Sequence, residues 1–160
     1  MAAAPAIALI GTLDTKGAEI AYVRDRLRAL GARPIVIDTG ILGAPLDCEP
    51  DVPAGAVAAA AGDDLAAIRA AGSRGAAVER MLAGVRAVCV RLYAEGRLDG
   101  ALCLGGAEGG MMGAGAMHAL PVGVTTSFGT PIGSACIAPA PIIPPSAPPR
   151  HSAPSSRPSV

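Results

Sequence analysis

Five residues near the N-terminus carry groups that proteins use to hold phosphate. The turn formed by Gly11, Thr12, Asp14, Thr15 and Lys16 follows an apolar run and precedes a segment with helical periodicity. Such a turn exposes main-chain N–H groups at the helix start, and this one adds two hydroxyls and one ammonium. Asp14 would repel a bare phosphate, but its carboxylate could cap the helix or hold Mg²⁺. The turn matches neither the Walker loop nor G-x-G-x-x-G, so a capped helix with a solvated lysine stays open.

A second glycine-rich turn, GGAEGG, occupies residues 105–110. Glycines allow main-chain amides to approach an anion closely. Glu108 disfavours a phosphate cradle here, so a flexible turn is the alternative. Arg74 could reach a phosphate from a helix start, or could be an ordinary surface arginine.

Asp38 ends an apolar run about 20 residues beyond the first turn, where an acid can bind ribose hydroxyls in Rossmann-type sites. The alternative is an aspartate that caps the next turn. The sequence predicts no Ser-His-Asp or Cys-His arrangement and no pair of carboxylates for acid–base catalysis.

The elements that position these residues alternate between strand and helix. Apolar runs at 6–10, 34–38 and 101–104 predict buried parallel strands, and a fourth strand is expected to begin at 122–124. Helical periodicity predicts a helix from Lys16 to Leu30, capped by Asp14 or Thr15. Further helices are expected at 54–61, 64–71, about 74–96 and 111–120, with a loop at 39–53. The pattern predicts a Rossmann-like, three-layer α/β domain with a mainly parallel sheet, whose glycine turns face one crevice.

Composition narrows the class of partner. The formal net charge is zero and aromatic residues make up only 2% of the chain. We therefore expect no nucleic-acid partner and, because the N-terminal apolar run is too short, no membrane span. The four scattered cysteines form no C-x-x-C pair, which disfavours structural zinc and indicates a cytoplasmic protein.

Four sequence blocks occur in the order seen in one family: GTLDTKGAE, VIDTGILGAP, AGSRGAAVERM and LGGAEGGMMGAGAMHALP. On these blocks the chain resembles the Tm-one-like ATP-binding domain family. The resemblance implies a Rossmann-like N-terminal domain that binds ATP, and we expect ATP with or without Mg²⁺. The nucleotide-binding residues that it implies are Gly11, Thr12, Asp14, Thr15, Lys16, Asp38, Thr39, Gly105, Gly106 and Gly109.

Two features depart from the family pattern. Gly110 stands where the glycine-rich loop usually ends in Gly-Thr, and Glu108 stands where Gly or Gln is more usual. After Val124, a proline-rich segment replaces the rest of the fold and the family's second, barrel-like domain. We therefore expect a truncated chain: an ATP-binding domain over 1–124 with an incomplete sheet, and a disordered proline-rich tail over 125–160.

The sequence thus predicts a nucleotide-binding module that turns over no substrate by itself. The alternative is a protein-interaction module, or a truncated fragment without activity, because an incomplete sheet leaves an open edge strand. Homo-oligomer formation is left open.

Overall fold

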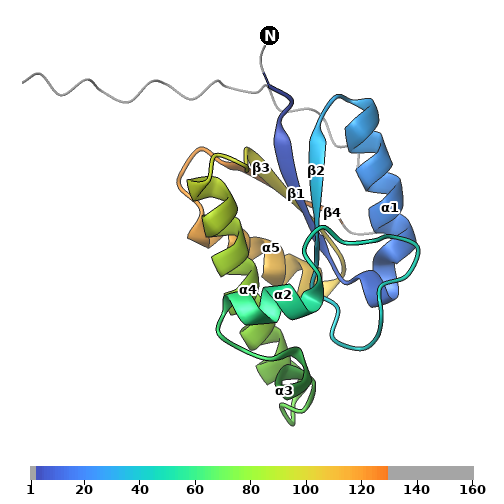
Figure 1. Cartoon of the computed structure of the whole chain (residues 1–160), viewed down its shortest axis with the longest axis vertical. Coiled ribbons are helices and arrows are strands. Elements are labelled where there is room, and N and C mark those ends of the chain that lie inside the picture. The colour runs from blue at the N-terminus through green and yellow to red at the C-terminus, as the bar shows by residue number, and fades with distance from the viewer. Residues whose placement is uncertain (1–2, 130–160) are drawn as a thin grey trace, which may run out of the picture.

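Four parallel strands form the sheet at the centre of the protein (Figure 1). A computed structural model describes residues 3–129. The strands are β1 (Ala6–Gly11), β2 (Arg33–Asp38), β3 (Gly100–Leu104) and β4 (Thr125–Gly129), and they lie in the order β2-β1-β3-β4. The first three are apolar and almost entirely buried, as expected of a parallel sheet covered on both faces.

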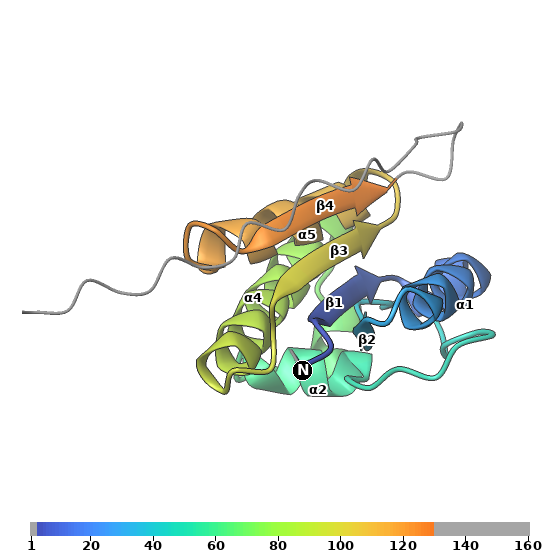
Figure 2. The ribbon, with the colours of Figure 1, turned by 90° about the horizontal axis from the view of Figure 1, so that it is seen from above.

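Four of the five helices cover the two faces of this sheet, and the third packs against two of the others. The helices are α1 (Leu13–Ala29), α2 (Ala54–Ala60), α3 (Leu65–Arg69), α4 (Arg74–Ala94) and α5 (Ala107–Ala119). Helix α1 packs against Leu9, Val36 and Leu102 on one face, whereas α2, α4 and α5 lie on the other (Figure 2). The predicted Rossmann-like, three-layer α/β fold is therefore confirmed.

The chain changes direction across the sheet at β1. It moves from β1 to β2 on one side and then crosses to β3 on the other side of β1. Gly11 at the end of β1 pairs with Asp38 on β2 and with Leu104 on β3. The ends of β1 and β3 thus form the topological switch point of the sheet, outside which doubly wound folds bind their ligands.

Three elements begin more than two residues away from the start that the sequence predicts. Helix α1 begins at Leu13 with Thr12 as its N-cap, so Asp14 and Thr15 lie inside the first turn and do not cap it; Lys16 departs from helical geometry (φ −128°, ψ 20°). Helix α5 begins at Ala107, so much of the GGAEGG segment is helix and not a flexible turn. The fourth strand begins at Thr125.

The C-terminal segment is described only in part. Residues 125–129, which the sequence assigns to the tail, form β4 beside β3. The rest of the predicted tail lies outside the described residues. Among residues 3–129, no helix is both long enough and apolar enough to cross a bilayer.

The loop over residues 39–53 is held against the sheet at several points. Its end runs beside β2, where Val52 N donates to Val36 O at 3.0 Å and Asp51 accepts from Val36 N at 2.7 Å. Nearer its start, Leu46 N donates to Leu13 O at 3.0 Å. The loop therefore has a defined path across the carboxyl edge of the sheet and beside the start of α1.

Candidate functional site

A small cavity lies at the carboxyl edge of the sheet, beside the starts of three helices. Its volume is about 30 Å³, and its lining includes the N-cap residue of α1, the first residue of α4 and the second residue of α5. The lining residues are Thr12, Asp14, Thr15, Ile41, Leu42, Arg74 and Glu108. The first predicted phosphate turn and the start of α5 are thus brought to one place.

The polar side chains of the first turn bond to one another. The hydroxyls of Thr12 and Thr15 lie 2.8 Å apart, and Lys16 Nζ donates to Glu19 Oε1 at 2.9 Å. The hydrogen bond from Lys16 holds the pKa of the Glu19 carboxyl below its usual value. Neither part of the capped-helix alternative holds for these side chains: Thr12, the N-cap, makes no side-chain capping bond, and the lysine is paired with Glu19.

Asp14 anchors the loop that follows β2. Its Oδ2 accepts hydrogen bonds from Leu42 N at 2.7 Å and Gly43 N at 3.2 Å. A Cβ on Gly40 would lie only 2.7 Å from the Asp14 carboxyl carbon. The Oδ1 atom of Asp14 is buried and has no hydrogen-bond partner among the described residues. The carboxylate therefore ties the start of α1 to the 39–53 loop, a role that the sequence did not predict.

Asp38 performs the capping role, and it does so from the neighbouring strand. Its Oδ1 accepts from Leu13 N at 3.1 Å, at the start of α1, and from Gly40 N at 2.8 Å, in the next turn. The residue is only 3% exposed, and burial raises the pKa of its carboxyl, while the two amide donors act in the opposite direction. The adjacent Thr39 is buried too, and its hydroxyl has no hydrogen-bond partner among the described residues.

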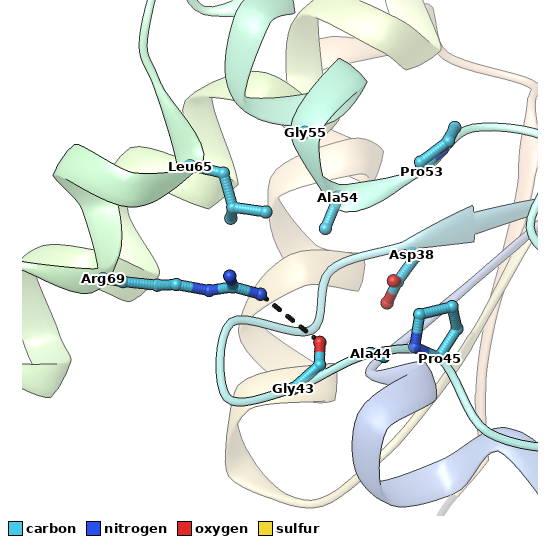
Figure 3. A pocket seen from close by; sticks show the side chains of 9 residues that line it. All are labelled: Asp38, Gly43, Ala44, Pro45, Pro53, Ala54, Gly55, Leu65 and Arg69. Carbon is cyan, nitrogen blue, oxygen red and sulfur yellow. Dashed lines mark hydrogen bonds between the residues drawn. The ribbon is translucent and has the colours of Figure 1, made fainter.

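A larger cavity of about 340 Å³ lies beside Asp38, between the 39–53 loop and helices α2 and α3 (Figure 3). Asp38 forms part of one wall, and Arg69 reaches in from the end of α3. Arg69 donates to Ile41 O at 2.8 Å and to Gly43 O at 3.3 Å. Sequence analysis missed both Arg69 and this cavity; the length of the loop was the only signal of them.

The second turn is shaped by close backbone contacts. Gly105 has φ +151°, a conformation that side-chain-bearing residues rarely adopt, and a Cβ on Gly109 would lie 2.9 Å from Leu104 O. These glycines let α5 begin directly at the end of β3. Gly106, the N-cap, makes no side-chain capping bond. None of the three glycines lines either cavity.

The predicted site residues that line a cavity are divided between the small and the large cavity. Thr12, Asp14 and Thr15 line the small cavity, and Asp38 lines the large one. Between the two cavities runs the 41–43 segment: Ile41 and Leu42 line the small cavity and Gly43 lines the large one. No group of three or more His, Cys, Asp or Glu side chains able to hold a metal ion occurs in residues 3–129.

Two of the cysteines, Cys89 and Cys103, are buried in the core. Burial raises the pKa of the Cys89 thiol to about 11 and that of Cys103 to about 12. Neither thiol is therefore a candidate nucleophile near neutral pH.

Comparison with known proteins places the same region in one family. The N-terminal domain of an uncharacterised protein family, UPF0261, matches residues 5–128. A UPF0261 protein of Clostridium tetani is 36% identical over 118 residues, which are 74% of this chain and 29% of that protein. A UPF0261 protein of Brucella suis is 37% identical over 120 residues, which are 75% of this chain and 28% of that protein. The chain thus spans under a third of the length of these curated relatives.

Proposed function

The chain belongs to the UPF0261 family, whose N-terminal domain it carries, and from that premise we propose that it binds a nucleotide, with ATP preferred. One observation carries the proposal: the β1–α1 and β3–α5 turns flank the switch point between β1 and β3. In open α/β sheets, ligands bind in the crevice outside this point. The resemblance to the Tm-one-like ATP-binding domain family, on the GTLDTKGAE and glycine-rich blocks, supports ATP as the ligand.

The two cavities suggest how the nucleotide lies. The 340 Å³ cavity beside Asp38 falls within the size range of small-molecule sites, and Asp38 supplies an acceptor for ribose hydroxyls. The phosphates then extend toward the starts of α1 and α5, where the positive ends of the two helix dipoles favour an anion. Because the 41–43 segment runs between the cavities, binding requires this segment to shift from its bonds with Asp14 and Arg69.

Asp38 and Thr39 are the residues at which a nucleotide-binding domain and a fold without a ligand should differ most. Both are buried at the end of β2, and the Thr39 hydroxyl is without a partner among the described residues. A buried hydroxyl of that kind is costly unless it gains a hydrogen bond. A ligand at this edge would supply one.

Calorimetric titration of the full chain with Mg-ATP, combined with thermal unfolding, tests the proposal. Heat of binding and a rise in Tm are expected at millimolar ATP or below. Asp38→Asn should weaken binding about tenfold or more, the effect of losing a charge-assisted hydrogen bond. Asp99→Asn is the matched control, because Asp99 also accepts a main-chain N–H, that of Ala6, but at the opposite edge of the sheet. A folded chain that shows no heat and no Tm shift would refute nucleotide binding.

The same experiment addresses the alternative of an interaction module or an inactive fragment. Size-exclusion chromatography and circular dichroism on the same sample report the oligomeric and folded state. A folded monomer that binds ATP supports the proposal, and an aggregated or unfolded chain favours the alternative.

A further inference from the structure

One ion pair joins two helix starts at the edge of the small cavity. Arg74, the first residue of α4, donates from its Nε to the carboxylate of Glu108 in the first turn of α5. The two residues are 34 positions apart, so the contact depends on the tertiary fold. Both side chains line the small cavity beside Thr12 and Thr15.

The two partners differ in exposure and in electrostatic setting. The Arg74 side chain is 73% exposed, whereas that of Glu108 is 28% exposed. A cation at a helix start faces the positive end of the helix dipole and is disfavoured there, whereas an anion is favoured. The α4 start therefore holds a guanidinium beside the positive end of the helix dipole, and Glu108 supplies a compensating negative charge.

The cavity left around this pair is small for the ligand proposed above. At about 30 Å³ it has room for water but not for a chain of phosphate groups. A phosphate entering beside Thr12 and Thr15 would also meet the negative charge of Glu108. The carboxylate thus competes with a ligand both for space and for Arg74.

We propose that Glu108 is an internal competitor for the phosphates of the nucleotide, and that binding requires it to leave Arg74. This inference rests on the proposed function, and it identifies the ligand group concerned as a polyphosphate. Displacing the carboxylate frees the guanidinium for a bidentate contact with phosphate. Glu108 therefore lowers the affinity of the site for phosphate.

A purely structural ion pair predicts different behaviour. Exposed pairs contribute little to stability, and removing either partner would then lower stability slightly without raising any affinity. In the competitor arrangement the two partners have opposite effects on binding. Removing Glu108 tightens it and removing Arg74 weakens it.

The test is calorimetric titration of the full chain with Mg-ATP and with inorganic tripolyphosphate, which lacks the base and sugar. Glu108→Gln keeps the shape of the side chain and should bind both probes about tenfold more tightly, because a like charge is removed from beside the phosphates. Arg74→Gln should bind about tenfold more weakly. Glu95→Gln is the matched control, since Glu95 pairs with Arg97 just after the other end of α4, and its affinity should stay within about twofold of wild type.

The outcomes separate this inference from the proposed function. Equal affinities of wild type and Glu108→Gln for ATP would overturn the inference and leave the proposed function standing. Binding by Glu108→Gln alone would support the inference and refute ATP binding by the unmodified chain. If neither folded protein binds either probe, both proposals fail. Circular dichroism of every variant verifies the fold. If the Glu108 carboxylate competes with phosphate for Arg74, the double variant Arg74→Gln/Glu108→Gln should bind with an affinity near that of wild type.

Discussion

The two turns beside the switch point use their polar groups in different ways. In the first turn the side chains are committed within the fold: Thr12 bonds to Thr15, Lys16 pairs with Glu19, and Asp14 holds the 39–53 loop. In the second turn, Gly106 makes no side-chain cap, and Glu108 reaches across to another helix. A turn rich in phosphate-binding residue types can thus have a largely structural role, whereas the charged side chain of the glycine-rich turn pairs with the start of another helix.

The largest expected effect follows from adding one methyl group beside the first turn. A Cβ on Gly17 would lie 1.7 Å from the main-chain oxygen of Leu46, so Gly17→Ala must displace the loop or the helix. We expect the free energy of unfolding to fall by about 3 kcal/mol, as for severe overpacking. Urea unfolding followed by circular dichroism measures it.

The matched control is a glycine in the first turn of α5. A Cβ on Gly110 would have no neighbour within 4 Å, and the residue lies within a helix. Gly110→Ala should therefore stabilise the protein by up to about 1 kcal/mol. Equal effects at the two positions would show that the loop does not pack on the first turn as described.

The next effect in size concerns the carboxylate that anchors the loop. Asp14→Ala removes the acceptor for Leu42 N and Gly43 N, and the expected loss of stability is about 1–2 kcal/mol. Hydrogen exchange of these two amides should accelerate more than that of the sheet. Asp25→Ala is the control on the same helix: Asp25 is 60% exposed in its pairs with Arg24 and Arg28, so its loss should lower stability much less than Asp14→Ala does. Unchanged exchange at Leu42 and Gly43 would contradict the anchoring role.

Much of the fold follows from local patterns in the sequence. Continuous apolar runs predicted β1, β2 and β3, and helical spacing predicted α4. The structure shows that Ser73 caps α4. These features depend on neighbours in the chain, so the sequence displays them directly. The weakly patterned α5 was placed too late, because its glycines resemble a loop.

The partners of the site residues could not be predicted in the same way. Asp38 caps α1 from a distance of 25 residues, Asp14 bonds to residues 28 and 29 positions away, and Arg69 reaches Ile41. Such pairings depend on which strands become neighbours and on the path of the loop. Residue types alone suggested a ligand for Asp14, whereas its tertiary contacts show that it bonds to the 39–53 loop.

A smaller effect, with a defined pH dependence, is expected at Asp38. Burial raises the pKa of its carboxyl above 3.8, so the folded protein holds this proton more tightly than the unfolded chain does. Its contribution to stability is therefore present below pH 3.8 and is lost as the pH rises through the folded pKa. The Asp38→Asn variant has no carboxyl to titrate, so its stability relative to wild type should increase over that pH window.

Unfolding free energies of both proteins between pH 3 and 7 measure the effect. A relative stability that falls as the pH rises would mean that the amide donors of Leu13 and Gly40 outweigh burial. Asp38 would then act chiefly as a charged cap and not as a carboxyl held at a cost beside the large cavity.

The smallest effect on stability is expected at Lys16. The effect of the same substitution on nucleotide affinity decides whether the first turn is structural or binds phosphate. The pair with Glu19 is partly exposed and spans three helical positions, so Lys16→Met should change the free energy of unfolding by under about 0.5 kcal/mol. If the ammonium leaves Glu19 for the nucleotide, Lys16→Met should nevertheless weaken Mg-ATP binding about tenfold in calorimetry, and Glu19→Gln should strengthen it. Unchanged affinity in both variants would assign the first turn to the fold alone. Phosphate recognition would then rest on Arg74 and the start of α5, and the contrast between the two turns would be complete.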